Sequence, residues 1–409
     1  MCRGTHVMQG CMRQEASYIT IQQIPSQDLT FISHNVSRIT DMATNTITTA
    51  PEAGNKSTAP ATSIARNPKD SMKSTWRTWD RKTWNHEQKI MDLLGLHPTD
   101  LNREVPVFAK TDQMAYVPHM EGHKWILFHA LWPLLVHQAY IYITGKNMHW
   151  AAAFLFYSIT YKFNAIREIH KMRELGHQYG YLDGDKHERD QVPDSRTKEV
   201  LHSLTSTATI RPIVSCFLAY ATSQDPFSTF SWHLPLEIGA YGAILDFWFY
   251  WYHRVMHENE TLWSFHRTHH LTKHPSPLLS LYADSVQEVF DIIGIPIITY
   301  GTMKLMGMPM GFADWWICQQ YVVFTELWGH SGLRLYITPP TTFTPVLKFF
   351  DAELLTEDHD LHHRKGWKNS HNYGKQTRLW DRLFGTCHER IEAVESNIDW
   401  DTPVSLSLW

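Results

Sequence analysis

The stretch HRVMHENETLWSFHRTHH, from His253 to His270, carries five of the chain's 26 histidines. Neutral imidazole binds transition metals strongly, and no other common side chain does so without carrying a charge. Further histidines follow with related spacing, and the complete set of candidate ligands is His253, His257, His266, His269, His270, His330, His359, His362 and His363. Nine ligands exceed what one ion needs. The pattern therefore predicts two metal ions held side by side and open to a third reactant.

The spacing inside these groups explains how they serve two ions. His253 and His257 lie one helical turn apart, so both rings point from one face of a helix. The H-x-x-H-H groups that begin at His266 and His359 each hold a pair of histidines on one face and a third that points elsewhere. A single group of this kind can therefore supply ligands to both ions.

Six apolar blocks follow one another along the chain from residue 125 onward. They are residues 125–143, 150–163, 210–221, 232–252, 289–305 and 312–328. The first and the fourth reach the length of about 20 residues that a bilayer-spanning helix needs. The third contains Pro212 and is short enough to be a re-entrant segment or a buried core helix.

The connections between the blocks predict a topology. Residues 164–208 are rich in lysine and arginine, which places this connection in the cytosol by the positive-inside rule. Short turns between paired blocks indicate helical hairpins, which return every histidine group to the same side. We expect an all-α integral membrane protein with four to six transmembrane or re-entrant helices in hairpins and a cytosolic, histidine-rich di-metal cap. Two alternatives stay open: the blocks are core helices of a soluble protein, or the hairpins enter only one leaflet.

The composition excludes some partners and suggests the domain order. The chain has 409 residues, a net charge of -4 and a pI of about 6.7, so nothing indicates a nucleic-acid partner. Its beginning is rich in Ser, Thr and Asn and lacks the apolar run of a signal peptide. We expect a disordered polar region (1–85), a cytosolic pre-membrane segment (86–124), membrane hairpins with a cytosolic loop (125–230), a catalytic domain (231–390) and a C-terminal tail (391–409).

The histidine pattern resembles that of the fatty acid hydroxylase / sterol desaturase superfamily of membrane di-metal oxidases. The matching residues are His253-Arg-Val-Met-His257, His266-Arg-Thr-His269-His270, Gly329-His330 and His359-Asp-Leu-His362-His363. A further stretch is similar to the end of C-5 sterol desaturases and reads Asn372-Tyr373-Gly374, then Leu379-Trp380-Asp381-Arg382-Leu383-Phe384-Gly385-Thr386. The resemblance covers residues 235–386 and makes 231–390 a fatty acid hydroxylase-like domain.

This resemblance implies a function as well as a fold. It implies two non-haem iron ions bound by these histidines on the cytosolic face of the endoplasmic reticulum membrane. It also implies O2 activation and the hydroxylation or desaturation of a hydrophobic lipid, such as a sterol, a fatty acyl chain or a related polycyclic metabolite. Relatives take electrons from NAD(P)H through a reductase, often by way of cytochrome b5. This chain lacks the His-Pro-Gly-Gly motif of the haem domain fused to some relatives, so an external donor is expected.

One position departs from the superfamily pattern. Relatives with a full ligand set have a second histidine one turn before the position of His330, where this chain has Glu326. Three roles stay open for Glu326: a metal ligand, a group that orients an imidazole, and a helix-end acid that faces water. His274 and His371 are further imidazoles near the groups, and either is a candidate tenth ligand. Asp246 is costly to bury in an apolar helix, so we expect it to orient a ligating histidine or to make a helix-packing hydrogen bond.

Two other functions fit a histidine-rich membrane protein. A metal-ion transporter, or another metal-binding membrane protein, should place its ligands near the midplane of the bilayer, often on broken helices. The histidine groups lie instead at or beyond the ends of the apolar blocks. A zinc hydrolase on the same scaffold would need no O2. The sequence therefore favours an oxidoreductase, without separating hydroxylation from desaturation.

Overall fold

The computed structural model describes residues 70–184, 186 and 188–409. The first 69 residues of the predicted disordered region lie outside the described residues. The longer helices are α2 (His86–Leu93), α3 (His119–Thr144), α4 (Trp150–Tyr179), α5 (Thr197–Ala219), α6 (Leu234–Glu258), α9 (Ile295–Leu305), α10 (Phe312–Gly329) and α12 (Thr356–Lys365). The short ones are α7 (Glu260–His266), α8 (Ser285–Val289), α11 (Thr344–Phe349), α13 (Leu379–Phe384) and a π-helical turn, η7 (Phe290–Gly294). The prediction of a mostly helical protein is confirmed.

Short elements complete the fold. The 3-10 turns are η2 (Trp76–Thr78), η3 (Arg81–Thr83), η4 (Pro226–Thr229), η5 (His269–Leu271), η6 (Pro277–Leu279) and η8 (Glu395–Asn397). Strand β1 (Met114–Tyr116) pairs in parallel with β2 (Ile398–Pro403), which ties the predicted pre-membrane segment to the C-terminal tail. Val404 and Leu406 are buried after β2, so the tail packs against the rest of the fold.

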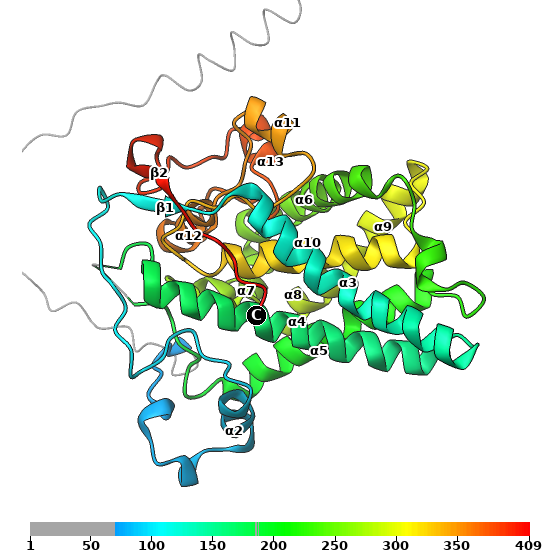
Figure 1. The fold of residues 1–409 in the computed structure, drawn as a ribbon. Coiled ribbons are helices and arrows are strands. Elements are labelled where there is room, and N and C mark those ends of the chain that lie inside the picture. Colours follow the sequence, from blue (N-terminus) through cyan, green and yellow to red (C-terminus); the bar gives the residue numbers. More distant parts are fainter. Residues whose placement is uncertain (1–69, 185, 187) are drawn as a thin grey trace, which may run out of the picture. The chain divides into compact units, whose positions relative to one another are not determined.

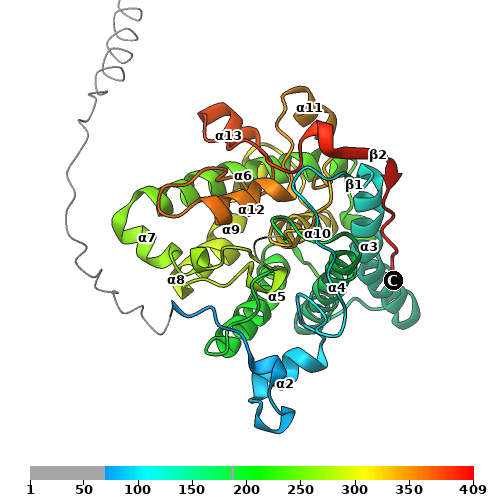
Figure 2. The same ribbon diagram turned by 90° about the vertical axis from the view of Figure 1, so that its left-hand side faces the viewer.

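Helix α10 is the centre of the fold, and every one of its residues is buried. A mostly apolar helix that is buried on every side has to be surrounded by other elements. Helices α3, α4, α5, α6 and α12 contact it, and Figure 2 shows α10 nearly end-on with these helices around it. Its last turn leads directly to His330, so the best-packed helix of the fold positions one of the predicted ligands.

The long helices form hairpins whose turns gather at one end of the helices, on the right in Figure 1. The Asn147 side chain, in the α3–α4 turn, donates to the backbone oxygen of Gln224 (2.7 Å) in the α5–α6 connection. That connection in turn meets the start of α10, where the backbone N–H of Ala313 donates to Thr229 Oγ1 (3.0 Å). Helices α7 and α12 lie at the opposite end.

Helix α3 is long and apolar enough to cross a membrane, and it alone among the described residues meets both conditions. All six predicted apolar blocks are helical, with Pro212 accommodated inside α5. Four to six spans, and a cytosolic histidine cap, therefore stay predictions.

Two predictions about the surroundings of the hairpins were wrong. Residues 70–85 were expected to be disordered, yet Trp76 is buried and its indole N–H donates to the Val192 backbone oxygen (3.1 Å). The Asp194 carboxylate accepts the Trp76 backbone N–H (2.8 Å), and the Trp76 ring packs edge-on against Trp84. The polar composition of this segment predicted disorder. The free energy gained by burying a tryptophan side chain, however, offsets the conformational entropy lost when several polar neighbours become ordered.

The second correction concerns the basic connection 164–208, which was expected to be a loop and is mostly helical, while its cytosolic position stays a prediction. Helix α4 continues to Tyr179, and only residues 180–196 join it to α5. Ile169, Met172 and Leu175 are buried along one side of the added turns. This spacing of three residues is typical of an amphipathic helix, and the lysines and arginines between these positions masked it.

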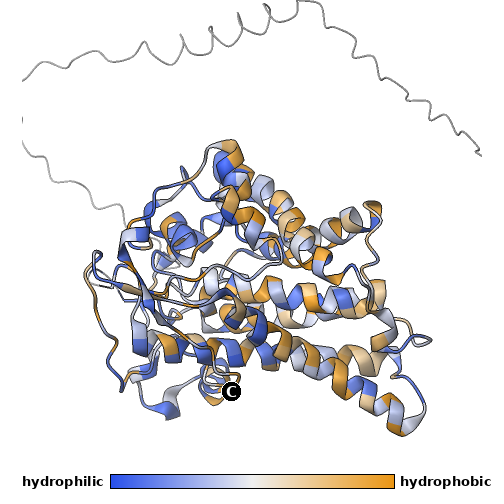
Figure 3. Ribbon diagram, turned by 45° about the horizontal axis from the view of Figure 1, so that its top comes forward, coloured by the Kyte–Doolittle hydropathy of each residue, from blue (hydrophilic) through white to orange (hydrophobic). Residues whose placement is uncertain are grey.

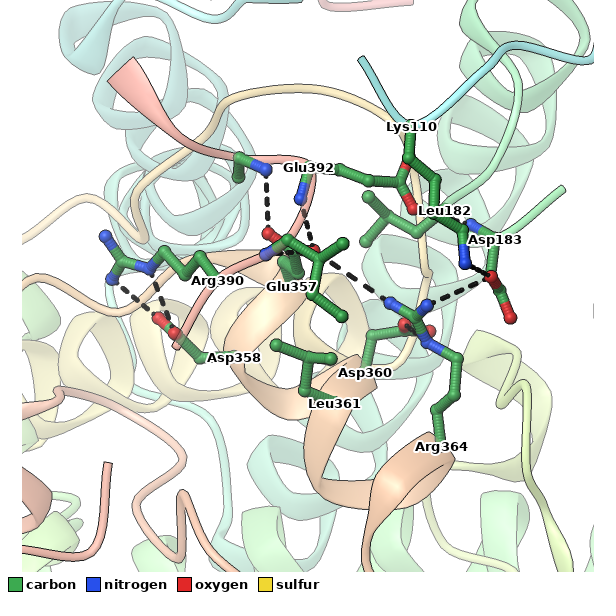
Figure 4. Close-up of polar contacts among 12 residues, drawn as sticks. Lys110, Leu182, Asp183, Glu357, Asp358, Asp360, Leu361, Arg364, Arg390 and Glu392 are labelled. Atoms are coloured by element: carbon green, nitrogen blue, oxygen red, sulfur yellow. Dashed lines mark hydrogen bonds and ion pairs between the residues drawn. The ribbon is translucent and has the colours of Figure 1, made fainter. Parts of the chain in front are cut away.

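Helix α12 carries predicted ligands on one side and acidic residues on the other, and Figure 4 shows how the acidic side is held. The Glu357 carboxylate accepts three backbone N–H groups of residues 391–393, at 2.7–3.1 Å. Asp358 pairs with Arg390 (2.7 Å). Asp360 binds both Arg189 (2.7 Å) and Arg364 (2.8 Å). The C-terminal segment and the α4–α5 connection thus fix the position of α12.

We predict that Asp360→Asn destabilises the protein by about 3 kcal/mol or more, because Arg189 would stay buried without its anion. Both side chains of this pair are fully buried. The matched control is Arg382→Ala, which removes an exposed pair with Asp351 and should cost less than about 1 kcal/mol. Thermal unfolding of the purified variants in detergent measures both values. Equal losses in the two variants would contradict the anchoring role of Asp360.

Candidate metal centre

The nine predicted histidines come together in two buried groups. The first group contains His253, His257, His266, His270 and His362. The second contains His269, His330, His359 and His363. Within each group, one ring nitrogen of every member lies within 4.8 Å of the others. The adjacent residues His269 and His270 enter different groups, as do His362 and His363, so each H-x-x-H-H segment contributes to both groups.

Outer hydrogen bonds determine which nitrogen of each ring faces inward. The Nδ1 atom of His253 lies 2.7 Å from the backbone oxygen of Tyr373, and that of His257 lies 2.8 Å from the oxygen of Trp367. Equivalent contacts to backbone oxygens hold His269, His330, His362 and His363. A carbonyl oxygen only accepts, so each of these Nδ1 atoms carries the hydrogen and each Nε2 presents its lone pair to the centre.

The distances between inward nitrogens fit metal ions. His266 Nε2 lies 3.0 Å from the Nε2 atoms of His253 and His257, and 3.1 Å from that of His270. A metal ion between the rings would accept the lone pairs of neighbouring nitrogens at separations of this size. Ligands at right angles around an ion with bonds of about 2.1 Å would stand about 3.0 Å apart. In the second group, His330 Nε2 lies 3.0 Å from His359 Nε2.

Burial keeps these imidazoles neutral, which metal binding requires. It lowers the pKa of His266 to about 4, against a smaller opposing effect of its hydrogen bond to Gln287. Burial also lowers the pKa of His330 to about 4, although its hydrogen bond to the Glu326 backbone raises it. Both rings are therefore uncharged at neutral pH. The residues fit two metal ions, one in each group.

Glu326, for which the role of metal ligand was one of three left open, lies in neither group. Its carboxylate pairs with Arg211 (2.8 Å) and with Lys375 (3.0 Å), and only its backbone oxygen contacts His330. It is also buried, so the interpretation as an acid facing water was wrong. Both carboxylate oxygens are engaged by cations, which compensates the cost of burying the charge.

Asp246 holds a loop rather than a histidine. Its carboxylate accepts the backbone N–H groups of Lys375, Gln376 and Thr377 at 2.7–3.1 Å, and the Thr377 hydroxyl at 2.6 Å. Asp381 accepts the two preceding N–H groups, those of residues 373 and 374. These two acids fix residues 373–377, which carry the backbone oxygen bound to His253. Asp246 therefore acts on His253 through the backbone and makes no direct contact with the ring.

The two additional histidines lie outside both groups. His274 pairs with Asp183 (3.2 Å), and His371 contributes its backbone oxygen to His362 Nδ1 (2.6 Å). Sequence reasoning missed Gln287, whose side-chain oxygen lies 2.9 Å from His266 Nδ1, because nothing in its neighbourhood marks it. It also missed Arg211, although an arginine inside an apolar block was an available signal.

Comparison with known proteins identifies a family whose model covers these histidines. A model of the family described as fatty acid hydroxylase matches residues 238–386, which include all nine histidines. The fatty acid hydroxylase vlmA of a Lecanicillium species is 43% identical over 309 residues, which span 72% of this chain and 84% of that protein. This chain belongs to the fatty acid hydroxylase family. Membership makes it an oxygen-dependent hydroxylase or oxidase.

More distant relatives of this fatty acid hydroxylase family member share only part of the chain. Methylsterol monooxygenase erg25B of Aspergillus fumigatus is 27% identical over 176 residues, or 42% of this chain and 53% of that protein. Alkylglycerol monooxygenase of Homo sapiens is 27% identical over 161 residues, or 38% of this chain and 32% of that protein. No solved structure matches the chain.

We predict that His266→Ala lowers the content of bound transition metal by one ion or more, because this ring neighbours three others in its group. The matched control is His274→Asn, which removes a nearby buried imidazole outside both groups and should leave the metal content unchanged. Elemental analysis of the purified proteins measures the difference. A full complement of metal in the His266 variant would remove this ring from the ligand set.

We also predict that Asp246→Ala weakens metal binding by roughly 10- to 100-fold without removing any ligand, because loop 373–377 would lose its anchor. Competition with a chelator measures the affinity. The control is Asp225→Ala, which removes the acid that caps η4 at the opposite end of the helices. Equal affinities in the Asp246 variant and the unaltered protein would show that His253 is held without the loop.

Proposed function

We propose that this protein is a membrane-bound, non-haem di-iron oxidoreductase that uses O2 and electrons from NAD(P)H to hydroxylate a hydrophobic lipid. The observation that carries the proposal is the pair of buried groups of neutral imidazoles, with five and four members. The five-histidine group would hold one iron and the four-histidine group the other. The electrons would arrive through an external reductase or cytochrome b5.

Iron is favoured because the family's reaction depends on oxygen. Iron changes oxidation state under biological conditions, whereas zinc does not. When bound, the two irons would supply the activation of O2 that attack on a C–H bond requires. The chain's own contribution is to hold nine neutral rings in fixed orientations and to keep water from them. All nine ligating residues are buried, which supports both tasks.

The proposed substrate is a long fatty acyl chain. The relative that matches most of this chain is named a fatty acid hydroxylase, and it is matched over far more of its length than the sterol-modifying relative. A sterol is the second candidate, because the C-terminal stretch resembles that of sterol desaturases. The names hydroxylase and monooxygenase favour insertion of oxygen over desaturation.

Exposed apolar side chains support a position in a bilayer. Tyr142 and Ile143 at the end of α3 are 90% and 81% exposed, and Trp232 before α6 is fully exposed. Leu305 at the end of α9 is 91% exposed. These residues lie at the turns of the hairpins, away from the histidines, and Figure 3 shows many apolar residues along the same helices. Such surfaces mark contact with a membrane or a partner. We propose insertion of this end into the endoplasmic reticulum membrane, with the histidines facing the cytosol.

An oxidase is better supported than a metal transporter. The two histidine groups lie near the ends of α6 and α10 that are distant from the hairpin turns, whereas a transporter needs ligands deep in the bilayer. The family membership also argues for an enzyme. A hydrolase on the same scaffold would work without O2, so the activity assay separates these alternatives.

We predict that microsomes containing the protein, a reductase and NADPH convert a fatty acyl lipid into a product heavier by one oxygen atom. The oxygen should come from labelled O2 and not from water, as lipid mass spectrometry will establish. His269→Ala should abolish the product, because this ring belongs to the four-histidine group, whereas His274→Asn should retain it. Product that persists without O2 would indicate a hydrolase. A change restricted to cellular metal content would indicate a transporter.

A further inference from the structure

The anchor of His266 differs from the others in the two groups. Six of the nine rings have Nδ1 against a backbone oxygen, whereas His266 Nδ1 faces the side-chain oxygen of Gln287 at 2.9 Å. A backbone oxygen is fixed by the fold. A side-chain amide has to be oriented by something else, since its oxygen and nitrogen exchange places when it turns over.

Asp291 provides that orientation. The Gln287 side-chain nitrogen donates to Asp291 Oδ2 at 3.3 Å, so the amide oxygen is the atom that faces His266. Gln287 is buried, and Asp291 lies four residues later in the π-helical turn η7. Turns of this kind are rare and occur often at functional sites. Here, the carboxylate fixes the amide and the amide fixes the hydrogen on His266 Nδ1.

His266 makes more short Nε2–Nε2 contacts than any other ring of its group. Its Nε2 atom lies within 3.1 Å of the Nε2 atoms of His253, His257 and His270. A change in the electron density of this ring therefore acts on the ion that these four rings would share. Groups that accept a hydrogen bond from a metal-bound imidazole raise its basicity and commonly alter metal affinity by 10- to 100-fold.

We propose that Gln287, oriented by Asp291, is a positioning residue that fixes the tautomer of His266 and tunes the metal ion of the five-histidine group alone. The inference rests on the proposed di-iron function. It assigns the two ions different surroundings, because the rings of the four-histidine group have no side-chain amide as an Nδ1 partner among the described residues. In the four-histidine group the one side-chain contact to an Nδ1 atom that the described residues show is the Thr272 hydroxyl, 3.2 Å from His363 Nδ1, and that ring also has the Thr272 backbone oxygen at 3.0 Å.

The test uses the full chain loaded with isotopically enriched iron and examined by Mössbauer spectroscopy. Gln287→Leu should weaken the binding of one iron by about 10- to 100-fold and leave the other unchanged. Gln287→Glu should retain both irons and shift the signal of only one. A charged acceptor at Nδ1 raises the basicity of Nε2, which then donates its electron pair to the metal more strongly. Asp291→Asn keeps an acceptor oxygen and should stay close to the unaltered protein, whereas Asp291→Leu should resemble Gln287→Leu.

The matched control is Gln319→Leu, which removes another buried amide that donates to Ser215 in the helix core (2.6 Å). It should leave both iron signals unchanged. If Gln287→Leu and Gln287→Glu both kept the Mössbauer signals and the iron affinity of the unaltered protein, the proposal would be overturned. Gln287 would then contribute only to packing. A protein that binds no iron before any substitution would instead refute the proposed function, so the two failures are distinguishable.

Discussion

Hydrogen bonds from imidazole Nδ1 atoms to backbone oxygens are the interaction on which the centre depends. An imidazole can present either nitrogen, and nine unconstrained rings would have many arrangements that bind nothing. Six of these rings are fixed because a backbone oxygen only accepts. The positions of these backbone oxygens therefore determine the orientations of the six rings. Loops such as 367–373 become as important as the ligands themselves.

The acidic residues around the centre follow from this requirement. A loop that supplies a backbone oxygen has to be rigid, and Asp246 and Asp381 make residues 373–377 rigid by accepting their N–H groups. Glu357 does the same for residues 391–393 behind α12. A buried carboxylate is costly unless each oxygen has donors, and these have several. The centre is therefore neutral inside, with its charges arranged in an outer layer.

The sequence indicated which histidines come together, because their spacing is periodic. His253 and His257 lie on one helical face, and each H-x-x-H-H segment divides between the two histidine groups, as the sequence indicated. The sequence was also sufficient for the helical blocks, since long apolar runs rarely adopt another structure. Prediction from the sequence failed for side chains whose contact partners lie far away along the chain. Nothing near Glu326 reveals that Arg211 and Lys375 bind it, and nothing near Gln287 reveals His266. A local pattern specifies which side a residue faces, but not what it meets there.

The dependence of α12 on residues 390–393, which follow it in the chain, sets the order in which the centre assembles. Helix α12 carries three of the nine histidines, and it is held by Arg390 and the backbone of residues 391–393. Beyond these, β2 pairs with β1 near the start of the described fold. A ribosome that has released His363 has therefore not yet released the segment that fixes it. A metal ion would therefore find a finished pocket only after residues 390–403 have folded against the rest, and a chain without them would have mobile histidines in place of a fixed site.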